Sequence, residues 1–209
     1  MIENWYLKGQ TRCLRSESGA FYIDNEGVVQ RFEPSGDNPI MEEKVEEPQA
    51  YYGFVMKESI RHLIVPEGVK GFRSEFMRGI SVMERFSLPD GLLCIGNNTH
   101  EVVTNDADCV FANCSLPTVI IPESVKELGS FAFGHTRIEC LQLPESLHSP
   151  YGRQFKDSTI GILRLPKGWK EGVSLDKDGS LRLMGVWFSD DKYGYLRWQS
   201  THVEKLEFY

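Results

Sequence analysis

Residues 138–147 read Ile-Glu-Cys-Leu-Gln-Leu-Pro-Glu-Ser-Leu, an apolar strand-like segment followed by proline, an acidic residue, serine and leucine. Similar segments surround Pro66, Pro89, Pro122 and Pro166. The five prolines lie 23, 33, 22 and 22 residues apart along the chain. A period in the twenties is typical of a solenoid, in which each repeat forms one coil.

Three positions before each proline are apolar in all five copies. A chain that is 41% hydrophobic would supply only about six of these fifteen residues by chance. The positions three and one before the proline have the period of a β-strand, so both side chains point to the same face. We therefore expect these positions to form the core. They are Ile60, Met83, Leu116, Ile138 and Ile160 at position six before the proline, Leu63, Phe86, Val119, Leu141 and Leu163 at position three, and Val65, Leu88, Ile121, Leu143 and Leu165 at position one.

A phenylalanine follows several of the prolines by ten or eleven residues, at Phe76, Phe133 and Phe155. Phe111 joins this series if about 11 residues between Asn97 and Ala107 are counted as an insertion. We expect these rings to fill the interior opposite the strands. Because one repeat cannot bury its apolar side alone, successive repeats would stack at the strand spacing of about 4.8 Å.

Residues 128–133, which read Leu-Gly-Ser-Phe-Ala-Phe, complete a pattern together with residues 138–147. The pattern resembles the BspA-like leucine-rich repeat, whose units combine an apolar strand, Pro-x-Ser/Gly-Val/Leu, Ile-Gly, Ala-Phe and Cys. The resemblance covers roughly residues 54–172. It implies a non-catalytic module that binds a protein or peptide, and the best-known members are bacterial surface proteins that bind host matrix components or other cells. At the position where the family often has cysteine, this chain has Cys114, Thr136 and Ser158.

These patterns predict a repeat solenoid, a short right-handed leucine-rich-repeat coil with a parallel β-strand ladder, few helices and β-rich caps at both ends. We expect an N-terminal β-rich cap with an acidic linker (1–53), the repeats (54–172) and a C-terminal aromatic-rich β cap (173–209). A hairpin is expected around residues 24–27, and the charged stretch between Pro34 and Pro48 is expected to be a solvated loop.

The net charge, the N-terminal residues and the cysteines exclude several classes of function. A net charge of −7 argues against nucleic acid as a partner, because binding to phosphates requires a basic surface. Residues 1–8 lack the basic and apolar segments of a secretion signal, and no run of about 18 apolar residues occurs. Five cysteines without paired spacing favour a reducing compartment. We therefore predict a cytoplasmic chain that does not contact a membrane.

We predict no catalytic residues, no metal and no cofactor. The segment from Asp176 to Gly179 begins like a calcium loop but has Trp187 at the twelfth position, where a glutamate is needed, so it predicts a hairpin turn. Cys109 and Cys114 have no second pair of ligands at zinc-binding spacing. No phosphate-binding glycine loop, zinc-protease motif or nucleophile elbow occurs.

Residues two and four before each proline alternate with core positions, so we expect them on the outer face of the strands. This face is either a binding surface for a protein or peptide or only the solvated side of a sheet. The alternative is a glycan or small-ligand platform in the aromatic C-terminal segment, formed by Trp187, Tyr195 and Trp198, and an enzyme of unrecognised type is a third possibility. The identity of the partner and the oligomeric state are not predicted. The predicted binding residues on the strand face are His62, Ile64, Arg85, Ser87, Thr118, Ile120, Gln142 and Arg164.

Overall fold

The computed structural model describes residues 11–46, 54–96, 109–147, 154–183 and 197–209. The described residues form β-strands and one 3-10 helix, η1 (Lys167–Gly172), so the prediction of a β-rich chain with few helices is confirmed. The strands are β1 (Arg12–Ser16), β2 (Gly19–Ile23), β3 (Val28–Pro34), β4 (Met41–Glu46), β5 (Phe54–Ile64), β6 (Gly71–Phe72), β7 (Ile80–Ser87), β8 (Cys94–Ile95), β9 (Ser115–Ile120), β10 (Glu127–Leu128), β11 (Arg137–Gln142), β12 (Thr159–Leu165), β13 (Val173–Leu175), β14 (Ser180–Leu183) and β15 (Arg197–Phe208).

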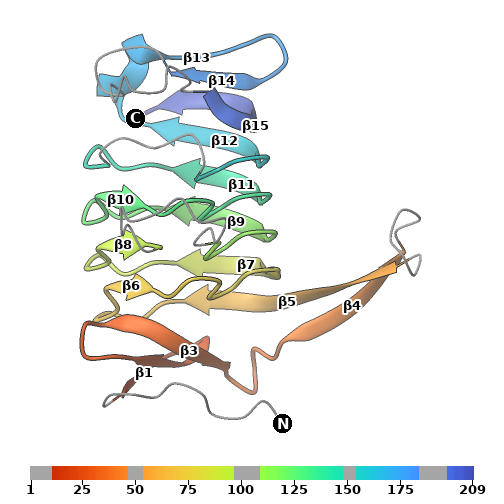
Figure 1. Ribbon diagram of the computed structural model, residues 1–209, viewed down its shortest axis with the longest axis vertical. Coiled ribbons are helices and arrows are strands. Elements are labelled where there is room, and N and C mark those ends of the chain that lie inside the picture. The colour runs from red at the N-terminus through yellow and green to blue at the C-terminus, as the bar shows by residue number, and fades with distance from the viewer. Residues whose placement is uncertain (1–10, 47–53, 97–108, 148–153, 184–196) are drawn as a thin grey trace.

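The strands that precede the prolines lie above one another along the long axis of the molecule (Figure 1). They fall into separate sheets: β5 pairs in parallel with β7 in the sheet β4-β5-β7, whereas β9, β11, β12 and β15 are parallel neighbours in the sheet β13-β14-β15-β12-β11-β9. The remaining sheets are β1-β2-β3-β6 and the pair β8-β10. The predicted solenoid with one continuous strand ladder is therefore not confirmed.

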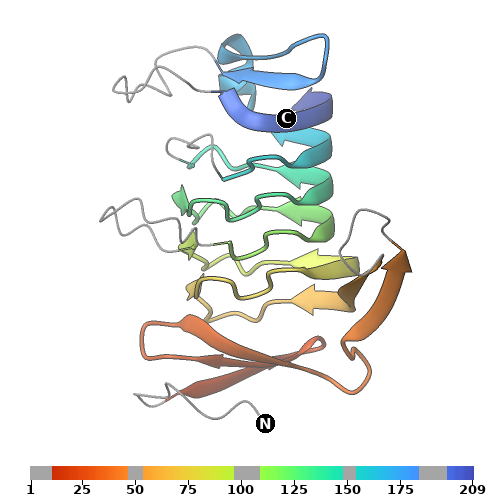
Figure 2. The same ribbon diagram turned by 45° about the vertical axis from the view of Figure 1, so that its right-hand side comes forward.

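The interruption lies between β7 and β9, which are adjacent in both views but share no sheet pairing (Figure 2). The Ser115 N–H donates to the Ser81 Oγ at 2.9 Å, so a side chain supplies the acceptor that a backbone carbonyl supplies in a strand ladder. A β-bulge in β7, where the register with β5 shifts between Ile60 and His62, changes the course of this strand.

The predicted core positions are buried in thirteen of the fifteen cases. The prediction is wrong for Met83, because this side chain is 59% exposed. The bulge in β7 places one extra residue in the strand, so that Val82 lies opposite Ile60 and is buried in place of Met83. The other exception is Leu88, which is only partly buried but packs against the core.

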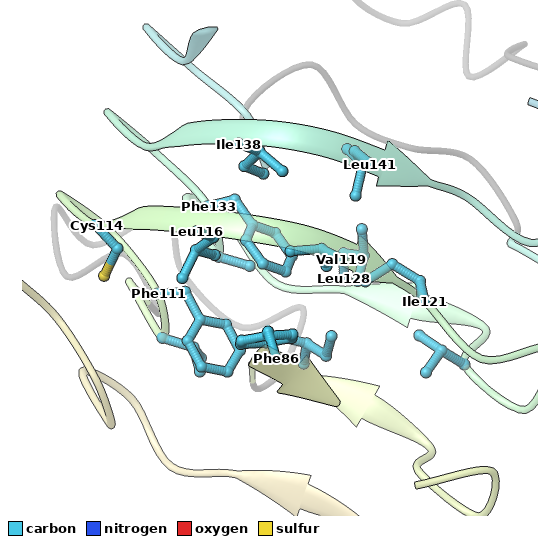
Figure 3. Packing of buried hydrophobic residues seen from close by; sticks show 14 of the residues in the cluster. Phe86, Phe111, Cys114, Leu116, Val119, Ile121, Leu128, Phe133, Ile138 and Leu141 are labelled. Carbon is cyan, nitrogen blue, oxygen red and sulfur yellow. The ribbon is translucent and has the colours of Figure 1, made fainter. Parts of the chain in front are cut away.

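The predicted column of phenylalanine rings is confirmed for Phe111, Phe133 and Phe155, whereas the buried Phe76 meets Phe111 edge-on at a centroid distance of 6.4 Å. Phe111, Phe133 and Phe155 are fully buried, with centroid distances of 5.4 Å from the first to the second ring and 5.3 Å from the second to the third. Both pairs are stacked, as expected for rings carried by repeats at strand spacing. Figure 3 shows Phe111 and Phe133 in the interior, with Phe86 next to Phe111.

Small hydrogen-bond donors form a second buried column. Each donates to the backbone carbonyl of a residue in the preceding repeat, and the Met77 and Phe155 carbonyls also accept from the N–H groups of Ile80 and Ser158. A thiol and a hydroxyl can both do this, which explains why serine or threonine replaces the cysteine of the family pattern. The contacts are Cys114 Sγ to Met77 O (3.2 Å), Thr136 Oγ1 to Phe111 O (2.7 Å), Ser158 Oγ to Phe133 O (2.6 Å) and Thr201 Oγ1 to Phe155 O (2.6 Å).

The buried column of hydrogen-bond donors predicts that Cys114 reacts more slowly than the exposed Cys13. Burial raises the pKa of the Cys114 thiol to about 12, and the thiolate is the reactive form. We expect iodoacetamide at pH 8 to label the exposed Cys13 in the native chain and to label Cys114 only after unfolding in urea. Peptide mass spectrometry measures both sites in one sample. Equal labelling of the two cysteines in the native chain would contradict the buried column.

β15 adds a repeat strand that the proline pattern does not predict. It runs parallel to β12, with Val203 opposite Ile160 and Leu206 opposite Leu163. Tyr209 stands where the other copies have proline. Its N–H donates to the Leu165 carbonyl (3.0 Å), one strand below. Because the proline is missing, the alignment on prolines overlooks this strand.

The parts outside the proline repeats agree only partly with the predictions. β2 and β3 form the hairpin expected around residues 24–27, and β13 and β14 form the one expected around residues 176–179. The charged stretch predicted to be a loop contains β4, which pairs antiparallel with β5 and projects from the stacked strands (Figure 1). The reason is that β5 extends beyond the repeat and offers its N-terminal half as a pairing edge.

Candidate partner-binding surface

The outward residues two positions before each proline form a row across the large sheet. Ile120 in β9 lies opposite Gln142 in β11, which lies opposite Arg164 in β12. β15 extends the row, because Glu207 lies opposite Arg164. The row therefore contains an apolar side chain, an amide and a pair of opposite charges on four neighbouring strands.

Ile120 is the apolar member of this row and is 54% exposed. Its neighbours in the chain, Val119 and Ile121, are buried, because alternate side chains of an extended segment point to opposite faces. Thr118, four positions before Pro122, is also exposed. The strand β9 thus presents an isoleucine and a threonine to solvent.

Arg164 and Glu207 form an ion pair in which Arg164 Nε lies 3.0 Å from Glu207 Oε2. Lys205 Nζ lies 2.7 Å from Glu207 Oε1. Hydrogen bonds from Lys205 and Arg164 lower the pKa of the Glu207 carboxyl, so this carboxylate is charged at neutral pH. Exposed ion pairs contribute little to stability, and Arg164 can therefore serve a partner without a large cost to the fold.

The other four predicted residues lie in the sheet β4-β5-β7. Arg85 and Ser87 belong to β7, and Arg85 Nη1 is 3.6 Å from Glu17 Oε2. His62 and Ile64 belong to β5 and are half-buried. The structure therefore divides the predicted surface into two groups, with Thr118, Ile120, Gln142 and Arg164 in one sheet and the remaining residues in the other.

Two buried polar residues cover the backbone of β5 at His62 and Ile64. Asn38 Oδ1 accepts from the His62 N–H (2.9 Å), and Asn38 Nδ2 donates to the His62 carbonyl (2.7 Å). Ser18 Oγ accepts from the Ile64 N–H (2.6 Å). These contacts satisfy backbone hydrogen-bonding groups at a strand edge, which would otherwise be open for pairing with another strand. The backbone of β5 is therefore used within the molecule at these two positions.

The residues five positions before each proline form a second outward row, which the alternation of side chains along a strand does not predict. Core positions six and three before the proline are separated by two residues, and strict alternation places only one of them outside. In three neighbouring strands the residue at position five is Glu139 in β11, Gly161 in β12 and Glu204 in β15; the two glutamates are exposed and the glycine is half-buried. The odd spacing of the core positions is the signal that could have identified this row.

A cavity of about 490 Å³ lies at this second row. Its lining comes from β11, β12 and β15, on the same sheet as the Ile120 row. The lining residues are Arg137, Ile138, Glu139, Thr159, Gly161, Ile162, Glu204 and Lys205.

The alternative aromatic platform is not tested. Trp187 and Tyr195 lie outside the described residues, and Trp198 belongs to β15 without a described side chain. The predicted insertion from Asn97 to Ala107 also lies outside the described residues. Among the residues that are described, no group of three potential metal ligands occurs. The described part of the chain likewise has no helix with the length and apolar character needed to cross a membrane.

Comparison with known families gives a match over part of the repeats. The family model described as BspA type leucine rich repeat region (6 copies) matches residues 101–171, which contain the copies at Pro122, Pro144 and Pro166. The predicted resemblance is confirmed over this range, which is narrower than the predicted 54–172 because it does not include the copies at Pro66 and Pro89. No curated protein and no solved structure gives a significant match to the chain.

Proposed function

We propose that the chain is a non-catalytic module that binds a protein or peptide, because the model of the BspA-type leucine-rich repeat matches residues 101–171. The proposed contact surface is the outer face of β9, β11 and β12, with Ile120 as its apolar anchor. The family match supports a binding role, since leucine-rich repeats commonly present a strand face to proteins.

The exposure of Ile120 is the observation that carries this proposal. An isoleucine that is 54% exposed on a rigid strand offers apolar area to a partner without any change in the fold. Its burial by a partner would contribute free energy to binding, and a few such residues usually dominate the affinity of an interface. Gln142 and Arg164 beside it would form the polar rim that such interfaces have.

We further infer that the two groups of stacked strands belong to one repeat coil, despite the separate sheets. The support is that β7 lies next to β9 and that the Ser115 N–H reaches Ser81 across the gap. In this interpretation, Arg85 lies at the margin of the proposed surface rather than at its centre.

The experiment compares capture of the natural partner by the unchanged chain and by Ile120→Ser/Arg164→Ser. Proteins retained from a lysate of the source cell are identified by mass spectrometry, and the affinity of the purified partner is then measured by calorimetry. We expect the double variant to weaken binding at least about 100-fold, because hot-spot residues contribute about 2 kcal/mol or more each. Its melting temperature should remain close to that of the unchanged chain, since both side chains are exposed.

Leu93→Ser is the matched control. Leu93 is 55% exposed but lies just before β8, away from the proposed surface, so this variant should bind normally. Equal affinity of Ile120→Ser/Arg164→Ser and the unchanged chain would refute the proposed surface. The aromatic segment with Trp187, Tyr195 and Trp198 would then be the next region to change.

A further inference from the structure

A side chain is missing from the second outward row of the sheet. At position five before the proline, the six repeat strands carry Arg61, Glu84, Pro117, Glu139, Gly161 and, in β15, Glu204. Gly161 is the one member of this row without a side chain. One position earlier in each strand, Ile138 lies opposite Ile160 and Ile160 lies opposite Val203. Gly161 in β12 therefore lies between Glu139 in β11 and Glu204 in β15.

The backbone geometry requires glycine at this position. A Cβ atom added to Gly161 would lie 2.6 Å from the backbone oxygen of Glu139, closer than real Cβ contacts. β12 therefore approaches β11 so closely that even alanine would force a shift. Gly161 lines the open cavity of about 490 Å³ described above.

The charges around this cavity favour a cation. Of the four charged residues in the lining, Lys205 is already paired with Glu207 at 2.7 Å. Within the described parts of the chain, Glu139 and Glu204 form no ion pair. A group placed above Gly161 would thus have a carboxylate on each neighbouring strand. Among the described residues, Arg137 is the one basic side chain of the lining that forms no ion pair.

The lining also offers an apolar contact. Ile162 follows Gly161 in β12, is half-buried and lines the cavity. Lysine and arginine combine a methylene stem with a charged end, and they commonly lay the stem on apolar surface. An isoleucine next to two carboxylates matches both parts of such a side chain.

We propose that this cavity receives one basic side chain, arginine or lysine, of the partner that binds the strand face. The inference rests on the proposed function, because the cavity and Ile120 belong to the same sheet. Glu139 and Glu204 hold the charged end, and Ile162 contacts the stem. The site gives the surface a preference for partners that carry a basic residue at the matching position, which a flat apolar face would not provide.

The test uses the complete ¹⁵N-labelled chain and short blocked peptides. Acetyl-Gly-Arg-Gly-amide and acetyl-Gly-Lys-Gly-amide should each shift the backbone resonances of Glu139, Gly161 and Glu204 in a saturable way. The same peptide with citrulline, which has the shape of arginine without the charge, should not. Equal shifts with the citrulline peptide, or no saturable shift with either basic peptide, would overturn the inference.

Variants show whether the two carboxylates are responsible. Glu139→Gln/Glu204→Gln preserves the size of both exposed side chains and should raise the Kd of the arginine peptide at least about tenfold, which corresponds to 1.4 kcal/mol. Glu145→Gln is the control, because Glu145 is an exposed carboxylate in the turn after β11 and does not line the cavity. An equal Kd for the double variant and this control would overturn the assignment of the two glutamates.

Failure of this inference can be distinguished from failure of the proposed function. If Ile120→Ser/Arg164→Ser abolishes binding of the natural partner while Glu139→Gln/Glu204→Gln binds it normally, the strand face is correct and the basic-residue site is wrong. If the arginine peptide binds as expected while Ile120→Ser/Arg164→Ser retains full affinity for the partner, the basic-residue site is correct and the proposed contact residues Ile120 and Arg164 are wrong.

Discussion

Replacing Phe133 by alanine is expected to lower the free energy of unfolding by about 3–5 kcal/mol, as for other buried phenylalanines. The ring is fully buried and stacks on Phe111 at 5.4 Å and on Phe155 at 5.3 Å, so its removal leaves a cavity between two repeats. Urea denaturation followed by circular dichroism measures the change as a shift of the midpoint at constant slope.

Met83→Ala is the informative comparison for this prediction. The repeat pattern predicts Met83 to be a core residue, whereas the structure leaves it 59% exposed at the bulge in β7. We expect a change within about 0.5 kcal/mol, as for other surface substitutions. A loss of several kcal/mol in Met83→Ala would show that β7 has the regular register of the sequence pattern and not the bulge.

Replacing Val203 by aspartate should have an effect of similar size, about 3–5 kcal/mol, because it places an unpaired charge in the core. Val203 is 1% exposed and lies opposite Ile160 in the parallel pair of β15 and β12. Thermal denaturation should show a strongly lowered Tm or loss of the cooperative transition.

The adjacent Glu204→Gln serves as the control, since Glu204 is exposed, and it should leave the Tm nearly unchanged. A Val203→Asp variant as stable as this control would mean that β15 does not close the core above β12. Because no proline follows β15 at Tyr209, this comparison also tests the one repeat strand that the proline pattern does not predict.

The predictable part of the core follows from local patterns. Ile138, Leu141 and Leu143 recur at the same distances from a proline as their equivalents in neighbouring copies, and all three are buried. Each copy must bury the same side of its strand against the copies above and below, so the apolar positions are similar in every copy. Met83 is the exception because a bulge depends on how β7 pairs with β5, which the residues of β7 do not reveal by themselves.

The candidate site is predictable to a smaller extent. Alternation identifies Ile120, Gln142 and Arg164 as outward residues, and their register puts them in one row. Alternation does not identify Gly161 as part of a site, because a glycine in a strand has no outward side chain to notice. Its importance follows from Glu139 and Glu204, which flank it from strands that are distant in the sequence.

The amino-acid sequence by itself determined the repeat, the core positions and the column of phenylalanine rings, because each of these depends on burial within one repeat and its neighbours. Only the tertiary structure decided which outward residues meet. Arg164 pairs with Glu207, 43 residues later, because β15 stacks on β12 although Tyr209 stands where the earlier copies have proline. Contacts across stacked strands depend on order and register between distant segments, and these are set by the packing of the whole chain.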